Sequence, residues 1–143
     1  MNELSNVDKE KLSVIEKNKI SEIIKPLTNE IHLFDTFIAG TSYIEDKNLF
    51  TNLKVGEELI LIRENNKFDD NAILVKNTHK EKLGYIPEKD NVIFSRLLDA
   101  GKLLKAKVNS VEKQGSMYKV AIGVYLFDFW WGKIFIMVIL HNK

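Results

Sequence analysis

The spacing of apolar residues changes from helical to strand-like near residue 30. Before that point, apolar side chains recur at roughly helical spacing, with lysine and glutamate between them. They are Leu12, Ile15, Ile20, Ile23, Ile24 and Leu27. Pro26 should end this helix near Ile24 or Lys25, because proline lacks an amide donor and disfavours a helical residue before it. We therefore expect an N-terminal helical extension over residues 1–30. It either packs on the domain or, as the alternative, binds a second copy or a partner.

Short apolar runs follow, separated by turn signals. They cover residues 31–40, 58–63, 72–76 and 82–86. Runs of this length are typical of strands, and the last three are apolar enough to be buried. Residues 54–56 (Lys-Val-Gly) are a turn signal ahead of the second run, and residues 77–80 (Asn-Thr-His-Lys) separate the third from the fourth. Pro87 ends the fourth run. The pattern predicts several short strands joined by tight turns.

A single internal helix is predicted near residues 90–100. Asp90 is a suitable N-cap, because its carboxylate can accept hydrogen bonds from the first amides of a helix. Apolar residues then fill one helix face: Val92, Ile93, Leu97 and Leu98. Gly101 is suited to end the helix, because glycine adopts the left-handed conformation that often follows the last turn.

A hairpin is predicted after this helix. Apolar residues 104, 106 and 108 alternate with Lys105 and Lys107, as expected for a half-buried strand with a cationic outer face. Residues 114–116 (Gln-Gly-Ser) are a turn signal, and residues 118–125 return as the second strand. Many short strands with one internal helix predict a mainly β (α+β) fold, a small and partly open antiparallel barrel over residues 31–125.

The end of the chain is strongly apolar. Over residues 125–140 only Asp128 and Lys133 interrupt the apolar run with charge. A membrane helix needs about 20 largely uncharged apolar residues, and this run is shorter. We expect two short strands within residues 126–143 that pack on the domain or on a second copy. A membrane-associated tail is the alternative.

Composition is that of an ordinary small globular domain. The 143 residues are 45% apolar and 29% charged, which allows one domain with a real core. The chain has no cysteine, so disulfides and thiolate metal sites are excluded, and the start MNELSNVDKEKL lacks the apolar stretch of a secretory signal. The net charge of +1 argues against a histone-like DNA coat, which needs many cations at the phosphates. A pocket that grips one strand end needs only a few local cations.

The loop between the second and third strands, residues 63–73, concentrates polar side chains around one aromatic residue, Phe68. Asparagine and aspartate stabilise turns by bonding to their own backbone, so turn chemistry explains much of this loop. The alternative is the rim of a ligand site. Nucleic-acid bases stack on exposed aromatic rings, and sugars bond to amides and carboxylates.

An ordered set of motifs resembles the HIRAN domain family over residues 34–125. The motifs are FIAGT at 37–41, LKVGEEL at 53–59, RE at 63–64, NKFDDNAI at 66–73, KLGYIP at 82–87 and LLDAG at 97–101. Each motif is weak alone, but their order and spacing are specific. The resemblance implies a partly open barrel similar to an OB-fold. Family members occur in helicase-like DNA-repair ATPases, and also alone or beside helicase and nuclease domains in bacteria and phages.

The resemblance also implies capture of the 3′ end of single-stranded DNA through its terminal hydroxyl and last bases. By position, Phe68 is expected to stack on the terminal base and Asp69 to accept the proton of the 3′-hydroxyl. Asn66 is expected to bind the end nucleotide, and Tyr85 to face the DNA backbone. Asn71 is expected to lock the loop.

Two departures from the family pattern reduce the expected phosphate contacts. The basic-aromatic pair of eukaryotic members is represented only loosely by Tyr43 and Lys47. A cation further along the family pattern is replaced near Glu88, which leaves Lys89 as the nearest substitute. The sequence contains no G-x-x-x-x-G-K-[ST] motif, so the chain is not itself a helicase.

Two groups of charged residues have alternative interpretations. Glu64, Asp69 and Asp70 could converge as a metal-dependent nuclease site, but turn capping explains the aspartates and is the interpretation we favour. Several lysines either form a solvated face or follow a DNA backbone. They are Lys102, Lys105, Lys107, Lys113 and Lys119.

The sequence therefore predicts a cytoplasmic DNA-binding module for DNA repair or replication-fork processing. We expect its partners to be the 3′ end of single-stranded DNA and a helicase or nuclease protein, with a homodimer as a further hypothesis. We expect no catalytic residues, metal, cofactor or small-molecule substrate. The alternative is a protein-interaction module of the same fold that has lost DNA binding.

Overall fold

In the computed structural model, residues 28–129 and 138–142 are described. Residues 30–128 form one compact unit. The helix expected before residue 28 and most of the apolar tail lie outside the described residues. Residues 138–141 form a single helical turn, in which the Asn142 amide donates to the Val138 carbonyl at 3.1 Å. The prediction of a strand was therefore wrong at the end of the tail, because a short apolar run has no periodicity that separates strand from helix.

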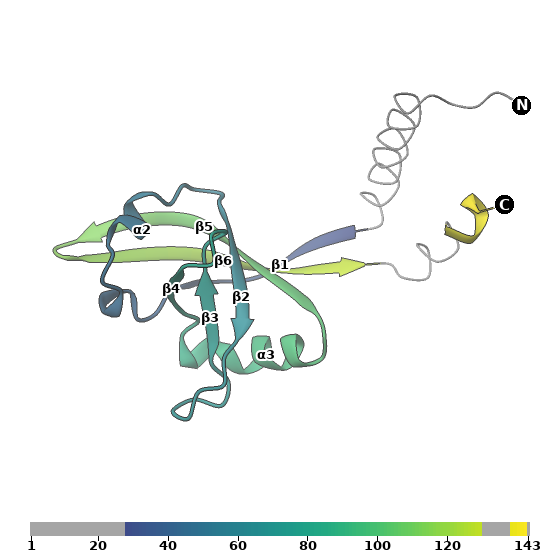
Figure 1. The fold of residues 1–143 in the computed structure, drawn as a ribbon, viewed down its shortest axis with the longest axis horizontal. Helices are drawn as coiled ribbons and strands as arrows, with labels where there is room; N and C mark the ends of the chain where they lie inside the picture. The colour runs from purple at the N-terminus through teal and green to yellow at the C-terminus, as the bar shows by residue number, and fades with distance from the viewer. Residues whose placement is uncertain (1–27, 130–137, 143) are drawn as a thin grey trace, which may run out of the picture. The chain divides into compact units, whose positions relative to one another are not determined.

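Six strands form one sheet, in the order β1-β6-β5-β2-β3-β4 (Figure 1). Their bounds are Thr28–Phe37 for β1, Glu58–Arg63 for β2, Ile73–Lys76 for β3, Lys82–Tyr85 for β4, Leu103–Gln114 for β5 and Met117–Phe129 for β6. The pairs β2–β3, β2–β5, β3–β4 and β5–β6 are antiparallel. The sheet curves into an OB-like half-barrel, as the sequence predicts. No helix among the described residues is long and apolar enough to cross a membrane.

The core is formed by alternate residues of the strands, which point to the same face of the sheet. On β2 and β5 the buried residues are Leu59, Leu61, Leu104, Ala106 and Val108. The turn signal at residues 54–56 is confirmed, since the Glu57 amide donates to the Lys54 carbonyl at 3.0 Å and Gly56 has a φ of 86°. A short helix that the sequence analysis did not predict, α2 (Asn48–Thr51), places fully buried Phe50 in the core against Tyr118.

The two edge strands meet at one point and close this end of the barrel. Ala39, just beyond β1, donates its amide to the Tyr85 carbonyl at 2.8 Å and accepts the Tyr85 amide at 2.9 Å. Gly84 makes this approach feasible. A Cβ atom there would clash with the Ala39 carbonyl oxygen and lie 2.6 Å from Cγ2 of Ile38. Its φ of 153° is also a conformation that side chains rarely adopt. We call this contact of Ala39 with Tyr85 the seam.

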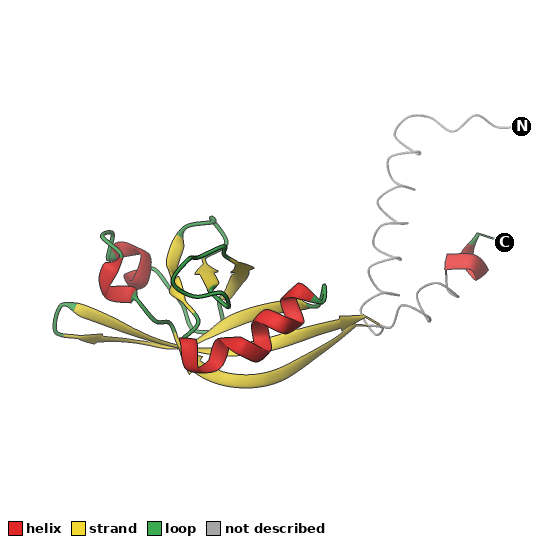
Figure 2. Ribbon diagram, turned by 90° about the horizontal axis from the view of Figure 1, so that it is seen from below, coloured by secondary structure: helices red, strands yellow, loops and turns green. Residues whose placement is uncertain are grey.

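The internal helix α3 (Glu88–Asp99) packs against β5 and β2 (Figure 2). Its C-terminus is as predicted, because the amides of Gly101 and Lys102 donate to the carbonyls of Leu98 and Leu97 and Gly101 has a φ of 84°. Its N-terminus differs, since Pro87 rather than Asp90 occupies the N-cap position.

The physical reason for the earlier start is that proline is compatible with the first turn of a helix, where its missing amide has no intrahelical partner. The Asp90 carboxylate instead accepts a 2.7 Å hydrogen bond from the Thr36 hydroxyl on β1. Asp90 therefore ties α3 to the edge of the sheet.

Candidate nucleic-acid interface

A pocket of about 390 Å³ opens beside the seam, between the β2–β3 loop, β4 and the segment that follows β1. Its lining residues are Ala39, Gly40, Tyr43, Ile44, Asn66, Phe68, Asp69, Ala72, Lys82, Tyr85, Ile86 and Glu88. Tyr43, Asn66, Phe68, Asp69 and Tyr85 were all predicted as site residues from the sequence, so the fold brings these distant positions to one cavity.

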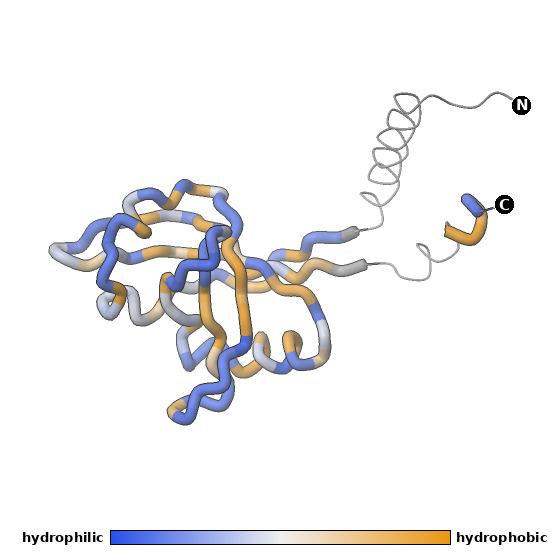
Figure 3. Tube along the Cα trace, in the orientation of Figure 1, coloured by the Kyte–Doolittle hydropathy of each residue, from blue (hydrophilic) through white to orange (hydrophobic). Residues whose placement is uncertain are grey.

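The β2–β3 loop is built from the turn chemistry that its asparagines and aspartates suggest. Oδ1 of Asn66 accepts the Phe68 amide at 2.8 Å, and the Asp69 amide donates to the Asn66 carbonyl at 3.3 Å. Oδ1 of Asp69 accepts the Asn71 amide at 2.9 Å. This tight turn leaves Phe68 at its tip with 86% of its surface exposed, on a loop that is otherwise mostly hydrophilic (Figure 3). Phe68 is therefore a rim residue and not part of the core.

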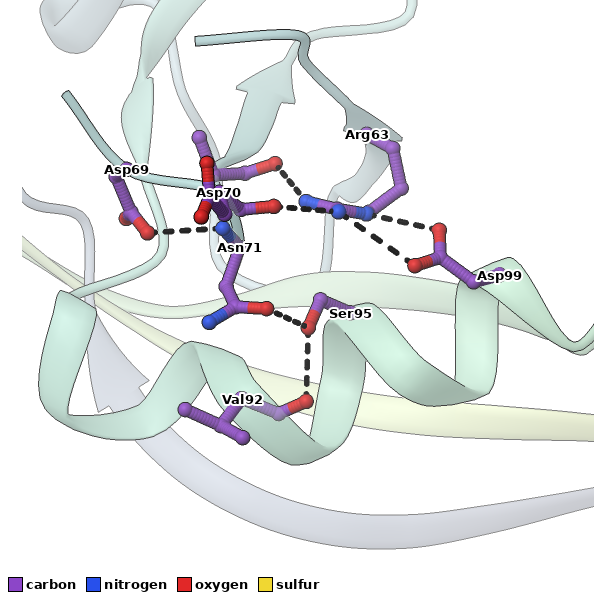
Figure 4. A network of polar contacts seen from close by, with 8 residues as sticks. Arg63, Asp69, Asp70, Asn71, Val92, Ser95 and Asp99 are labelled. Carbon is purple, nitrogen blue, oxygen red and sulfur yellow. Dashed lines mark hydrogen bonds and ion pairs between the residues drawn. The ribbon is translucent and has the colours of Figure 1, made fainter. Parts of the chain in front are cut away.

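Polar contacts fix the loop to α3 (Figure 4). The Arg63 guanidinium donates to the carbonyls of Asp70 and Ala72 at 2.7 and 2.8 Å, and to Oδ1 of Asp99 at 2.9 Å. The Ser95 hydroxyl lies 3.1 Å from Oδ1 of Asn71. Asn71 thus contacts the helix, in agreement with the expectation that it locks the loop.

The Asp69 carboxylate is held in place by a buried side chain. Oδ2 of Asp69 accepts a 2.8 Å hydrogen bond from Nδ2 of Asn91, which is 1% exposed on α3. Each oxygen of Asp69 therefore has one partner, Asn71 for Oδ1 and Asn91 for Oδ2. A carboxylate has about four acceptor positions, so this group can still accept a hydrogen bond from a ligand.

A second polar network borders the pocket on the side of β4. The Tyr85 hydroxyl lies 3.0 Å from each oxygen of the Glu64 carboxylate, to which it donates. It accepts a 2.9 Å hydrogen bond from Nζ of Lys82, which also lies 4.5 Å from the centre of the Tyr85 ring. Nδ2 of Asn66 donates to the same Glu64 carboxylate at 3.4 Å. Glu64 therefore links β4 to the loop that carries Phe68.

Tyr43 is at the pocket rim, whereas Lys47 and Lys89 are not among the lining residues. Tyr43 ends the 3-10 turn η2 (Thr41–Tyr43) and is 87% exposed. Nζ of Lys47 donates to the carbonyls of Thr41 and Ser42 at 3.1 and 3.3 Å, so it stabilises the turn that carries Tyr43. Lys89 lies on α3 and lines a different groove, together with Leu33 and Phe34 of β1 and apolar residues of α3.

Lys82 is the cation of the described lining, and sequence reasoning did not predict it as a site residue. Strict alternation places residues 82 and 85 of a strand on opposite faces. The pairs Lys76–Lys82 and Val75–Gly84 show that β4 has one extra residue, Leu83, at a bulge. The bulge turns Lys82 to the same side as Tyr85. The glycine before Tyr85 is the one sequence signal for it, because glycine inside a strand often marks a bulge.

The lysines on the outer face of β5 are engaged with neighbouring side chains. Lys107 forms an ion pair with Glu30 and lies over the Tyr125 ring, and the hydrogen bond to Glu30 raises the pKa of Lys107. Nζ of Lys105 lies 3.5 Å from the Glu58 carboxylate and 4.7 Å from the centre of the Phe127 ring. The charges of Lys105 and Lys107 are largely balanced, which at these two of the five lysines favours a solvated face over a phosphate-binding groove.

The carboxylates of the β2–β3 loop do not converge on a common point. Glu64 bonds to Tyr85, Asp69 bonds to Asn71 and Asn91, and the Asp70 side chain is exposed. Within the described part of the chain, no three histidine, aspartate or glutamate side chains are grouped so that they could hold a metal ion. The geometry therefore does not support the alternative of a two-metal nuclease site, which needs converging carboxylates.

Comparisons with known proteins agree with this architecture. The sequence matches the HIRAN domain over residues 31–127. A solved structure of a protein from Lactobacillus plantarum is 29% identical, with a TM-score of 0.65, and the match covers 71% of this chain and 98% of that one. The HIRAN domain of human HLTF shares the fold with a TM-score of 0.58 at 15% identity, over 74% of this chain and 84% of that domain. No curated protein sequence matches.

Proposed function

Because the chain belongs to the HIRAN domain family, whose members are known in general as DNA-binding modules, we propose that it holds the 3′ end of a single DNA strand in the pocket at the seam. The observation that carries this proposal is the pairing of two exposed aromatic rings with a fixed carboxylate in one small cavity. Strand ends supply the matching groups, a stackable base and a free hydroxyl.

The aromatic rim supports binding of an unstacked base. Phe68 and Tyr43 are 86% and 87% exposed on two different segments that border the pocket. Bases stack on exposed aromatic rings with little sequence preference. We assign the terminal base to Phe68, and Tyr43 to the same or the next base.

The carboxylate supports recognition of a hydroxyl. Asp69 is fixed by Asn91 and Asn71 and retains acceptor capacity, so it can accept the proton of a 3′-hydroxyl. The charged residues of the described lining are Asp69, Glu88 and Lys82, an excess of one negative charge. A 3′-phosphate would be repelled by this lining, whereas a neutral hydroxyl would not. Asn66 is assigned to the same nucleotide, next to Asp69 in the turn.

The proposed setting is DNA repair or replication-fork processing, in which a helicase or nuclease partner supplies the catalysis. In this proposal Lys47 acts by positioning Tyr43, and Lys89 contributes at most to strand segments beyond the pocket.

The test is a fluorescence anisotropy titration with a short single strand labelled at its 5′ end. We expect the strand with a 3′-hydroxyl to bind at least about tenfold more tightly than the same strand with a 3′-phosphate, the cost of about one charge-assisted contact. A blunt duplex of the same sequence is the control. Equal affinity for the two single strands would refute end recognition. Absence of binding to any strand would favour the alternative of a protein-interaction module.

A further inference from the structure

We propose that Lys82 binds the phosphodiester that joins the last nucleotide to the rest of the strand, and that Tyr85 and Glu64 position its ammonium group. This inference rests on the proposed function, because it assigns the negative charge of the same ligand to a specific residue. It also identifies what replaces the family cation that is absent near Glu88.

The pocket combines one cation, Lys82, with the carboxylates of Asp69 and Glu88, so its lining has a single group that can pair with the phosphate of a terminal nucleotide. Among the described lining residues Lys82 is the single cation, and Asp69 is the carboxylate with a fixed orientation. A nucleotide with a free 3′-hydroxyl carries one phosphate, on its 5′ side. The cavity of about 390 Å³ is near the lower end of the range for small-ligand sites, about 300–1,000 Å³, which suits one nucleotide. The hydroxyl is then assigned to Asp69 and the negative charge to Lys82.

Lys82 is held in position before any ligand binds. Its Nζ atom donates to the Tyr85 hydroxyl at 2.9 Å and lies 4.5 Å from the centre of the Tyr85 ring. The hydroxyl donates in turn to Glu64. A free lysine loses much rotamer freedom when it binds an anion, and a lysine that already rests on a ring loses less. An ammonium group has three donors, so Lys82 can keep its bond to Tyr85 and still bind a phosphate.

The hydrogen-bond network of Tyr85 and Glu64 extends to the β2–β3 loop, to which the 3′-hydroxyl is assigned. Glu64 accepts hydrogen bonds from both Tyr85 and Asn66, and the Asn66 carbonyl accepts the amide of Asp69. The groups assigned to the phosphate and to the hydroxyl therefore share one set of contacts. Their separation is fixed by the seam and the β2–β3 loop, which gives the pocket a defined spacing between charge and hydroxyl.

The competing interpretation is that Lys82 only covers the Tyr85 ring. The two interpretations differ in how Lys82 responds to the charge of the ligand. If Lys82 binds the phosphodiester, removing the lysine and removing the negative charge eliminate the same interaction. If Lys82 is only a packing residue, the two changes act independently.

The experiment measures affinities of wild type and Lys82→Ala for two strands that both end in a 3′-hydroxyl. One strand is unmodified, and the other has a neutral methylphosphonate at its last linkage. We expect the methylphosphonate to weaken wild-type binding by about tenfold, because it removes one charge-assisted contact. It should weaken binding by Lys82→Ala by less than about twofold, because this variant already lacks that contact. A strand with the methylphosphonate two linkages further in should bind both proteins like the unmodified strand.

Two further variants complete the test. Lys113→Ala removes an exposed lysine from the far end of β5, outside the pocket, and should retain the full methylphosphonate effect. Tyr85→Phe keeps the ring beneath Lys82 but removes the hydrogen bonds of the hydroxyl to Lys82 and Glu64, so it should reduce the methylphosphonate effect.

The outcomes separate this inference from the proposed function. Selective binding of 3′-hydroxyl ends with independent, additive losses for Lys82→Ala and the methylphosphonate would overturn the inference alone. Failure of the wild type to distinguish the two ends, or to bind either strand, would overturn both.

Discussion

Replacing Phe68 with alanine separates a stacking residue from a packing residue. The Phe68 ring is 86% exposed at the tip of the β2–β3 loop. Nζ of Lys67 lies 5.8 Å from the centre of this ring, in a cation–π contact. Little apolar surface is therefore buried by this ring in the free protein. Substitutions at such positions usually change the free energy of unfolding by no more than about 0.5 kcal/mol. We expect Phe68→Ala to unfold at nearly the wild-type denaturant concentration.

The same substitution should strongly affect binding. Loss of one stacking platform weakens single-strand binding by about 1–3 kcal/mol, roughly 5- to 150-fold in affinity. The assay pairs a urea unfolding curve with an anisotropy titration on the same preparation, at one fixed salt concentration because phosphate contacts depend on salt.

Phe50→Ala is the matched control for this experiment. Phe50 is fully buried on α2 and stacks on Tyr118. Its replacement should destabilise the fold by about 3–5 kcal/mol, the usual cost of emptying a core phenylalanine site. Wild-type stability together with unchanged DNA affinity in Phe68→Ala would remove this ring from the site, and a large loss of stability would contradict its assignment to the rim.

Three further predictions address the seam, the pocket carboxylate and pH. Gly84→Ala should lower the melting temperature markedly and weaken DNA binding, because its Cβ would collide with the Ala39 carbonyl and open the barrel; calorimetry that shows wild-type melting would contradict the seam. Asn91→Ala should destabilise the fold by about 1–3 kcal/mol in urea, since it removes the hydrogen bond to the half-buried Asp69 carboxylate, and should reduce the preference for 3′-hydroxyl ends. The hydrogen bond from His32 lowers the pKa of Asp35 below 3.8, so this pair stabilises the fold above that pH and the contribution is lost as pH falls through the lowered pKa. The free energy of unfolding of Asp35→Asn should therefore fall less at acid pH than that of wild type. The same fall in both proteins, measured by urea unfolding at several acid pH values, would refute this.

Most of the sheet follows from local sequence pattern. The apolar run at 58–63 corresponds to β2, and the turn at residues 114–116 places β5 against β6 as a hairpin. These features are predictable because alternation, turn residues and the glycine after α3 are each determined within a few residues.

The rest depends on contacts between distant segments. The short helix α2 has too few residues for a recognisable apolar period, and tertiary packing of Phe50 stabilises it. The seam joins Ala39 to Tyr85, and neither residue reveals its partner in sequence. The position of Lys82 depends on the bulge at Leu83, which reverses the face that simple alternation assigns. The candidate site was thus predictable in its loop residues and in Tyr85, but not in Lys82.

The central claim is that the pocket at the seam holds a strand end through its hydroxyl, and backbone amide NMR tests it most directly. A short single strand with a 3′-hydroxyl should shift the amide resonances of Asn66, Phe68 and Asp69 and the side-chain amide of Asn91. The same strand with a 3′-phosphate, at equal concentration, should leave them nearly unchanged. Shifts confined to the outer face of β5, around Lys105 and Lys107, or equal shifts with both strands, would contradict the account.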